Sequence, residues 1–254
     1  MVMRFASLGS GSKGNATLVE AGDACLLLDC GFSARELERR LSMLQLDGAR
    51  LSGILVTHEH SDHIKGVWTL SRRHQLPVYM TGGTAKASAA PADIDLHLIT
   101  PQQRFQVQGV DVLPVAVPHD AREPVQFVFN CAGLKLGVLT DLGHISSHVR
   151  ECYQGCDGLF VEANHDREML ADGPYPYSLK QRVAGDWGHL NNEQTAGLLN
   201  AVEPRTLQAL VVGHISQQNN ALSAVQEAMA SVASVVPEII YASQDDCVDW
   251  LVLE

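Results

Sequence analysis

Four apolar runs of strand length in this sequence each lead directly into a histidine or an aspartate. The runs and the residues that follow them are 51–57 before His58, 110–118 before His119, 134–140 before Asp141 and 207–213 before His214. In an α/β sheet the carboxyl ends of the strands gather along one edge, where binding sites usually form. The sequence therefore predicts a layered α/β fold with a polar site along one sheet edge.

The hydrophobic pattern also predicts the order of strands and helices. Strands are expected at 3–8, 15–20, 24–29, 51–57, 110–118, 125–133, 134–141, 158–163, 207–214, 238–243 and 249–254, and helices at 33–44, 64–74, 191–202 and 221–234. Early strands follow one another closely, as in antiparallel pairs, whereas helices separate several later strands. We therefore expect mixed sheets with helices outside them, in a single domain covering residues 1–254. Residues 81–104 could form a helix, a loop or both.

The composition is that of a globular protein without a membrane span. The hydrophobic share is 46%, and no apolar run reaches the roughly 18 residues that a spanning helix needs. The N-terminal segment has no long apolar stretch or cleavage pattern typical of a secretory signal. The six cysteines form no CxxC pair, which indicates reduced thiols. We therefore expect a cytoplasmic protein with no membrane partner.

The net charge of −11 excludes tight non-specific binding to nucleic acid through a broad basic face. A nucleic-acid substrate stays compatible with this charge, because a cleft can be basic on an acidic protein and bound cations offset local acidity. The only dense basic segments are residues 35–40 and 71–74. Their charge pattern is more typical of solvated helix faces than of a binding surface.

Residues 57–63 read THEHSDH and hold most of the titratable side chains of the predicted site. His58 and His60 are two positions apart on an extended chain, so their side chains point to the same side. Asp62 and His63 fall where the chain turns into a helix, so they can face a second metal. Imidazole and carboxylate together suit zinc, manganese or iron. The alternative, histidines that cap a turn or sit in the core, fits a lone histidine better than this pattern.

The H-x-H-x-D-H segment, followed in order by His119, Asp141 and His214, resembles the metallo-β-lactamase family. That resemblance implies a four-layer αββα sandwich with two divalent metal ions, either zinc, manganese or iron, along one sheet edge. It also implies the ligands: His58, His60 and His119 for the first metal, Asp62, His63 and His214 for the second, and Asp141 as the bridge.

Six further segments resemble the WalJ/VicX (YycJ) group within this fold. They are SLGSGSKGN, LLLDCGFS, TDLGHIS, VEANHD, GHLNNEQTA and GHISQQNN. Members of that group are regarded as DNA exonucleases that work from the 5′ end, so the resemblance implies a DNA substrate. Asn191 departs from the GHLSN expected there, but His189 and Asn192 are kept.

A two-metal site of this kind implies a hydrolytic mechanism. The metal pair lowers the pKa of a bridging water and neutralises charge on the phosphate oxygens. Asp62 is expected to orient the resulting hydroxide as well as to bind metal. His189 resembles the ribonuclease Z histidine that protonates the leaving oxygen. The alternative is that His189 merely precedes a helix and has no chemical role.

Weaker expectations concern substrate contacts. The Gly-rich loop at residues 9–15 is expected to join two strands, and its Ser12 and Lys13 could also hold a phosphate. His144 and His165 are expected to orient metal-binding side chains, although either could face the substrate or bind metal. Asn219 could bind a phosphate or a base, or could cap the next helix.

These expectations combine into a metal-dependent phosphodiester hydrolase, with a 5′-to-3′ DNA exonuclease as the first hypothesis. Two alternatives are a phosphodiesterase for a cyclic nucleotide or cyclic phosphate, and a metal-binding accessory protein without hydrolytic activity. The complete set of ligands and the proton donor argue against the second alternative. The physiological metal, the preference for single or double strands and the oligomeric state are left open.

Overall fold

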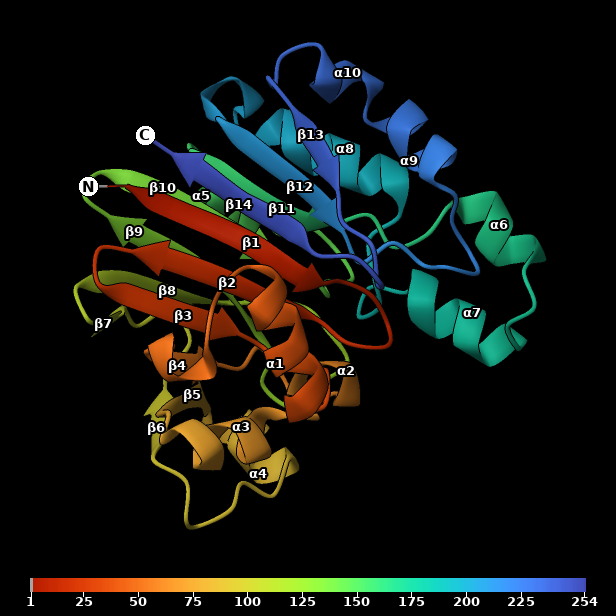
Figure 1. Cartoon of the computed structure of the whole chain (residues 1–254). Coiled ribbons are helices and arrows are strands. Elements are labelled where there is room, and N and C mark those ends of the chain that lie inside the picture. Colours follow the sequence, from red (N-terminus) through yellow and green to blue (C-terminus); the bar gives the residue numbers. More distant parts are fainter. Residues whose placement is uncertain (1) are drawn as a thin grey trace.

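The computed structural model describes residues 2–254 and consists of two β-sheets packed face to face, with helices on both outer faces (Figure 1). Each sheet has seven strands. The predicted four-layer αββα arrangement is therefore confirmed.

The first sheet is built mainly from the N-terminal part of the chain. Its strands, in spatial order, are β14 (Val248–Leu253), β1 (Met3–Gly9), β2 (Ala16–Ala21), β3 (Ala24–Leu28), β4 (Gly53–Leu55), β5 (Val78–Thr81) and β6 (Leu96–Ile99). The first four are antiparallel, and β3 to β6 are parallel. The last strand of the chain thus closes one edge of the first sheet.

The second sheet repeats this division into a parallel and an antiparallel part. Its strands, in spatial order, are β13 (Ile239–Tyr241), β12 (Ala209–Gly213), β11 (Gly158–Glu162), β10 (Leu134–Leu139), β9 (Val125–Cys131), β8 (Val110–Ala116) and β7 (Phe105–Val107). The strands β10 to β13 are parallel, and β7 to β10 are antiparallel. Consequently β8 runs in the same direction as β10, β11 and β12.

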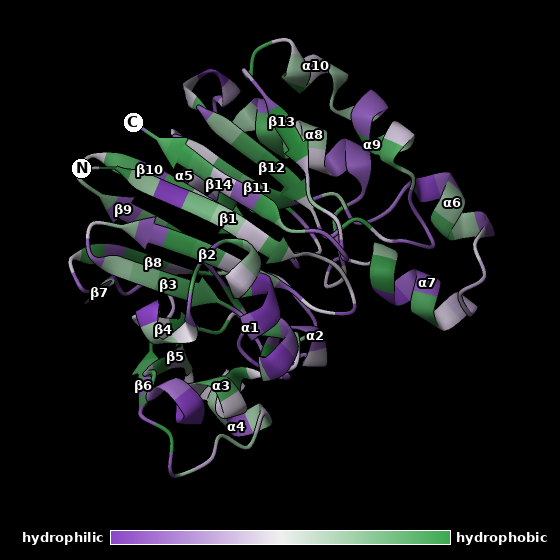
Figure 2. Cartoon of the chain, in the orientation of Figure 1, coloured by the Kyte–Doolittle hydropathy of each residue, from purple (hydrophilic) through white to green (hydrophobic). Residues whose placement is uncertain are grey.

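Successive residues of a strand serve different layers of the core. Phe5 and Phe127 point between the two sheets, whereas their neighbours Ala6 and Val128 pack under the outer helices. Both faces of each sheet are therefore buried, which explains why the strands read as continuous apolar runs. Figure 2 shows the strands mainly in the hydrophobic colour, while α1 carries hydrophilic residues.

The helices fall into two groups according to the sheet that they accompany. On the side of the first sheet lie α1 (Ala34–Met43), α2 (Ser61–Ile64), α3 (Val67–His74) and α4 (Gly82–Ala87), and with the second sheet lie α5 (Ser147–Tyr153), α6 (Arg167–Asp172), α7 (Tyr177–Ala184), α8 (Asn192–Ala201), α9 (Leu222–Ala228) and α10 (Ala230–Ala233). Within residues 2–254, none of these helices is long and apolar enough to cross a membrane.

Helices α6 and α7 project from the body of the molecule (Figure 1). No residue of α7 is buried, and Leu170 is the buried residue of α6. The hydrophobic pattern predicted neither helix, because α7 has no buried face to give an apolar stripe, and α6 is a six-residue helix with one buried residue.

The structure also corrects two predicted helices. The helix expected at 221–234 is divided at Met229 into α9 and α10. The helix expected at 64–74 is divided at Lys65 and Gly66 into α2 and α3. In the region left open at 81–104, α4 and β6 both form. The strand expected at 51–57 is hydrogen-bonded as β4 only over Gly53–Leu55.

The division between α2 and α3 has a clear cause in the surrounding loops. The carbonyl oxygen of Asp62 accepts a hydrogen bond from the Asn15 amide at 2.8 Å, so it does not pair with the amide of Gly66. Gly66 instead donates to the carbonyl of Cys30 at 2.8 Å. Gly31 packs so closely beneath Asp62 that a Cβ there would overlap the Asp62 backbone. The backbone of Asp62 is thus fixed from both sides by loops of the first sheet.

This close packing predicts that Gly31→Ala destabilises the protein. We expect the free energy of unfolding to fall by about 1–3 kcal/mol, because the added methyl group must displace backbone atoms. Urea unfolding followed by circular dichroism measures the change. Gly197→Ala is the matched control, since nothing lies within 4 Å of its Cβ position in α8. That control should be neutral or stabilising by up to about 1 kcal/mol. Equal stability of the two variants would contradict the prediction.

Candidate metal centre

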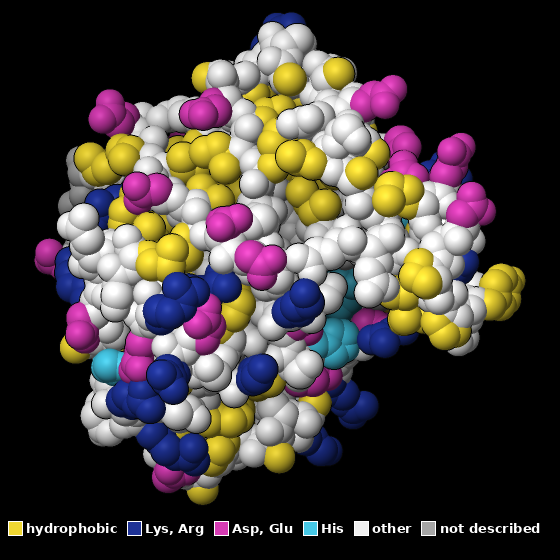
Figure 3. Space-filling model, turned by 45° about the vertical axis from the view of Figure 1, so that its right-hand side comes forward, with side chains coloured by type: hydrophobic (Ala, Val, Ile, Leu, Met, Phe, Trp, Pro, Cys, Tyr) yellow, Lys and Arg dark blue, Asp and Glu magenta, His cyan; other side chains and the backbone are white. Residues whose placement is uncertain are grey.

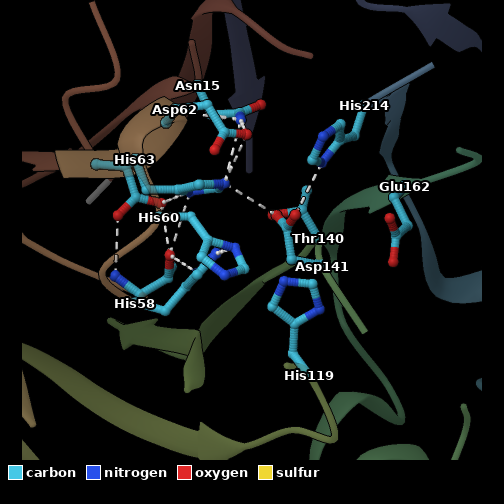
Figure 4. A network of polar contacts seen from close by, with 12 residues as sticks. Asn15, His58, His60, Asp62, His63, His119, Thr140, Asp141, Glu162 and His214 are labelled. Atoms are coloured by element: carbon cyan, nitrogen blue, oxygen red, sulfur yellow. Dashed lines mark hydrogen bonds and ion pairs between the residues drawn. The ribbon is translucent and has the colours of Figure 1, made fainter. Parts of the chain in front are cut away.

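The polar ends of several strands meet at one edge of the two sheets (Figure 4). His58 and His60 follow β4 of the first sheet, whereas His119, Asp141 and His214 follow β8, β10 and β12 of the second. The strands β8, β10 and β12 share one direction, so their carboxyl ends reach the same edge. The two sheets therefore contribute to a common site, whereas the sequence analysis expected it along the edge of one sheet.

His58, His60 and His119 form the first group of side chains that could hold a metal ion. One nitrogen of each ring lies within 4.8 Å of the others. The Nδ1 atom of His119 lies 3.0 Å from the carbonyl oxygen of Gly188, so it donates a hydrogen bond there and leaves a lone pair on Nε2. That Nε2 atom is buried and has no hydrogen-bond partner among the described residues. A buried lone pair without a partner is what a metal ligand provides.

Asp141 lies at the centre of the site, between histidines from both sheets (Figure 4). Its Oδ2 is 3.4 Å from His63 Nε2, and its Oδ1 is 3.2 Å from His214 Nδ1. The residue is 2% exposed and adopts a left-handed backbone conformation with φ of 55°. Burial opposes ionisation, but the neighbouring His214 and His63 outweigh it and hold the pKa of Asp141 well below its ordinary value. An ionised buried carboxylate in this position can bridge two cations.

His63 is oriented by Asp29, the residue that follows β3. The His63 Nδ1 atom lies 2.8 Å from Asp29 Oδ2, and Asp29 also accepts hydrogen bonds from the backbone and hydroxyl of Thr57 at 2.8 Å. Burial lowers the pKa of His63, but the carboxylates of Asp141, Asp29 and Asp62 outweigh this and raise it well above its ordinary value. The opposite nitrogen, Nε2, is left facing Asp62 and Asp141, each at 3.4 Å.

The Gly-rich loop at residues 9–15 contacts this centre through residues that the sequence analysis did not select. The Asn15 side-chain amide lies 3.2 Å from His63 Nε2 and 3.3 Å from Asp62 Oδ2. The Ser10 hydroxyl accepts a hydrogen bond from the His214 backbone at 2.9 Å. The contacts of Ser10 and Asn15 depend on tertiary packing, so the sequence alone does not reveal them. Asp29 is different, because it directly follows an apolar run, as His58, His119, Asp141 and His214 do, and the same pattern would have identified it.

His189 reaches the site from the segment after α7 and is held by Glu162. The His189 Nδ1 atom lies 2.9 Å from Glu162 Oε2 and 3.7 Å from Asp141 Oδ1. Burial favours the neutral ring, but the Glu162 carboxylate outweighs it and raises the pKa of His189 to about 9. Glu162 stands at the end of β11, and its side chain contacts His189 and neither His144 nor His165. Grouped by distance, His189 could also join a metal with His119 and Asp141, or with Glu162 and His214.

A cavity of about 340 Å³ opens onto this centre. Its lining includes Asp62, Asp141 and His189, together with Leu179 and Arg182 from α7. In Figure 3 histidine side chains are visible in a hollow between the body of the molecule and the part that projects at the right. The metal centre is therefore open on one side, so a substrate can reach it.

The predicted substrate-binding residues are distributed over different parts of the structure. Ser12 lines the cavity of the metal centre. Lys13 is exposed, and its ammonium group binds Gln217 Oε1 at 2.8 Å. His144 is also exposed, with Nδ1 3.0 Å from the carbonyl of Asp186.

The remaining two are buried and do not line the cavity of the metal centre. His165 is buried, lines a second cavity, and burial lowers its pKa to about 4. Asn219 is buried against Gly173, and its Oδ1 has no hydrogen-bond partner in the described part of the chain. The structure thus brings together the seven predicted metal-binding residues, His189 and Ser12, but not the other four.

The arginines of the two basic segments are largely paired with neighbouring carboxylates. Arg39 and Arg40 bind Glu36, and Arg73 binds Glu38. Arg39 and Arg73 are exposed, as expected for solvated helix faces, whereas Arg40 is buried and donates to the Leu8 carbonyl.

Comparison with known proteins places this centre in a family. Residues 25–215 match the family described as "Beta-lactamase superfamily domain". Exodeoxyribonuclease YycJ from Bacillus anthracis is 36% identical over 231 residues, which cover 87% of this chain and 85% of that protein. Exodeoxyribonuclease WalJ from Streptococcus pneumoniae is 33% identical over 223 residues, which cover 85% of this chain and 83% of that protein.

Solved structures show the same fold. The metallo-β-lactamase fold protein YhfI from Bacillus subtilis superposes with a TM-score of 0.73 at 14% identity, covering 97% of this chain and 98% of that one. The family match over most of the sequence, the two relatives and the αββα architecture show that this chain belongs to the metallo-β-lactamase superfamily.

Proposed function

We propose that the protein is a phosphodiester hydrolase with two divalent metal ions, and that it degrades DNA from the 5′ end. The observation that carries the hydrolase assignment is the buried carboxylate of Asp141 between histidines of both sheets. Asp141 and His214 line a cavity open to solvent, and His63 Nε2 faces Asp141 from the other sheet at 3.4 Å. The names of the two exodeoxyribonuclease relatives support DNA as the substrate.

The ligand assignment rests on the geometry of the donor atoms. In this proposal His58, His60 and His119 hold one ion, Asp62, His63 and His214 hold the other, and Asp141 bridges them. The site fits such ions, because three buried atoms make ion-pair contacts of 3.2–3.4 Å but no hydrogen bond among the described residues: His119 Nε2, Asp141 Oδ2 and His214 Nδ1. Imidazole and carboxylate donors suit zinc, manganese or iron. Ions bound there would supply Lewis acidity and lower the pKa of a coordinated water.

The side chains around the cavity would orient the substrate and move protons. Asp62 lines the cavity and can accept a hydrogen bond from the attacking water, which fixes its direction of approach. His189 lines the same cavity and is kept protonated by Glu162, so it can donate a proton to the leaving oxygen. Glu162 has no exposed surface, and its Oε1 accepts a hydrogen bond from the Leu142 backbone at 2.8 Å. The proton donor is thus held on a rigid support.

The charge distribution supports an approach of DNA from the side of the first sheet. Residues 1–90 contain ten of the 18 lysines and arginines but only eight of the 29 carboxylates. Figure 3 shows lysine and arginine side chains gathered on the lower part of the face, where Figure 1 places α1 to α4. This side adjoins the hollow that contains the histidines, so it offers a polyanion a less repulsive path than the rest of an acidic protein.

The first test of this proposal is metal content. The ligand set predicts close to two divalent ions per chain in protein purified without chelator, measured by elemental analysis. Asp141→Ala should lower occupancy of both positions together, because this carboxylate is shared. Asp172→Ala, an exposed aspartate in α6, should retain both ions. Wild-type protein that stays free of metal after reconstitution with zinc or manganese would contradict the assignment.

The second test is the polarity of DNA degradation. With manganese present, a 5′-labelled strand should release its label early as a mononucleotide or short oligonucleotide. A 3′-labelled strand should shorten progressively under the same conditions. Early release of the 3′ label, or internal cuts alone, would overturn the exonuclease assignment and leave the hydrolase chemistry in place. Activity on bis-p-nitrophenyl phosphate without activity on DNA would favour a small-molecule phosphodiesterase.

The third test separates proton donation from metal binding. His189→Ala should retain both metals but lower kcat on DNA by about a hundredfold or more, the usual scale for loss of a general acid. The loss should be much smaller on bis-p-nitrophenyl phosphate, because p-nitrophenolate leaves without a proton. His60→Ala should lose activity on both substrates, since it damages the metal centre.

His144→Ala is the control for this comparison, because His144 is exposed and outside the cavity lining. It should leave both activities unchanged. Loss of a metal in His189→Ala would show that His189 is a ligand, which its distances to His119 and Asp141 also permit. Full activity of His189→Ala on DNA would rule out the proton-donor role.

A further inference from the structure

A second cavity, of about 680 Å³, lies against α7 beside the metal centre. Helix α7 lines both cavities with different residues: Leu179, Arg182 and Val183 face the metal centre, whereas Tyr177, Lys180, Gln181 and Ala184 line the second cavity. Each set has the spacing of one helix face. Helix α7 is therefore a wall between two cavities.

The second cavity also shares a backbone segment with the metal centre. His165 lines it, and His165 forms an isolated parallel bridge with Asn191, two residues after His189. The backbone amide of Asn192 donates to the His165 carbonyl at 3.1 Å. A molecule in the second cavity would therefore contact the segment that carries His189 into the metal centre.

One buried polar atom at this cavity lacks a partner. His165 is 2% exposed, and its Nδ1 has no hydrogen-bond partner among residues 2–254. Buried imidazole nitrogens are normally hydrogen-bonded, so an unsatisfied one beside a cavity indicates a place where a ligand or a water can bind.

Several other lining residues suit the parts of a nucleotide. Leu170 and Ala171 give the cavity an apolar wall, and the Tyr177 ring, which is 73% exposed, can stack on a base. The Gln181 amide nitrogen donates to the Tyr177 hydroxyl at 2.6 Å, so its carbonyl oxygen is the atom that can pair with a base edge. Arg167 adds a positive charge suited to phosphate, and the carboxylate of Glu193 also lines the cavity. The volume lies within the usual range for small-molecule sites.

We propose that this cavity is a nucleotide subsite, which holds one nucleotide of the DNA strand while a neighbouring phosphodiester lies in the metal centre. This inference rests on the proposed function. Because α7 separates the two cavities, a strand that occupies both must pass over or around this helix. The subsite therefore contributes to binding of long substrates and is not needed for hydrolysis of small phosphodiesters.

Filling the cavity tests the subsite directly. Ala184→Phe places a large side chain in the cavity from an exposed position of α7, and Ser178→Phe makes the same change at an exposed residue of α7 that lines neither cavity. Calorimetry with the metal-loaded protein would measure binding of thymidine 5′-monophosphate and of inorganic phosphate. We expect Ala184→Phe to lose one thymidine monophosphate site, whereas Ser178→Phe retains it. Phosphate binding at the metal centre should be equal in both variants.

Kinetics provide the second measurement. Ala184→Phe and Tyr177→Ala should each raise KM for a DNA strand about tenfold, the scale expected when one base-stacking contact is lost. Neither should change kcat or KM for bis-p-nitrophenyl phosphate, which is too small to reach both cavities. Tyr177→Ala only removes atoms, so it tests the subsite even if the phenylalanine of Ala184→Phe disturbs α7.

The outcomes separate this inference from the proposed function. Unchanged thymidine monophosphate binding and unchanged KM for DNA in both variants would overturn the subsite, even if the protein degrades DNA. Equal losses on DNA and on bis-p-nitrophenyl phosphate in Tyr177→Ala would also overturn it, because the effect would then lie in the metal centre. Loss of one nucleotide site in Ala184→Phe supports the subsite, even if no exonuclease activity is found.

Discussion

The buried carboxylate of Asp141 is the interaction on which the rest of the structure depends. An ionised group with 2% exposure is costly unless positive partners surround it. Those partners come from both sheets, since His63 follows β4 and His214 follows β12. The two sheets must therefore meet with their polar strand ends aligned. The electrostatic requirement of one residue thus fixes the relative placement of the two halves of the sandwich at this edge.

A layer of polar contacts behind the histidines makes this arrangement rigid. Asp29 orients His63, Glu162 orients His189, and the carbonyl of Gly188 orients His119. Each ring donates a hydrogen bond from one of its nitrogens to such a support, so the other nitrogen faces the centre. The break between α2 and α3 at Gly66 also contributes to this rigidity. The loops at Asn15 and Cys30 take the hydrogen bonds that would continue the helix, and the bond from Asn15 holds the backbone of Asp62.

Local patterns in the sequence predicted much of this architecture. Most strands could be predicted because both sheet faces are buried, although the short strands β5 and β7 were missed. The cluster from His58 to His63 could be recognised because its residues are close together in the sequence. The contacts of Asn15 and the break at Gly66 could not, because they depend on loops brought together by folding. Helices α5, α6 and α7 were also missed, since α7 buries none of its residues and α5 and α6 have only seven and six residues. The assignment of His189 as proton donor came from resemblance and stays a prediction.

Because α7 has no buried residues, little free energy is needed to unfold it locally. Elements with few buried apolar contacts unfold at a free-energy cost far below that of the whole protein. The metal-binding side chains lie on strand ends anchored in the core, so they need not take part in such an opening. Amide hydrogens of α7 would then exchange with solvent well before those of β10 or β12. Because the backbone amide of His189 donates to the Val183 carbonyl of α7 at 2.9 Å, such an opening would release the backbone of His189 while the side chains on the strand ends keep their places.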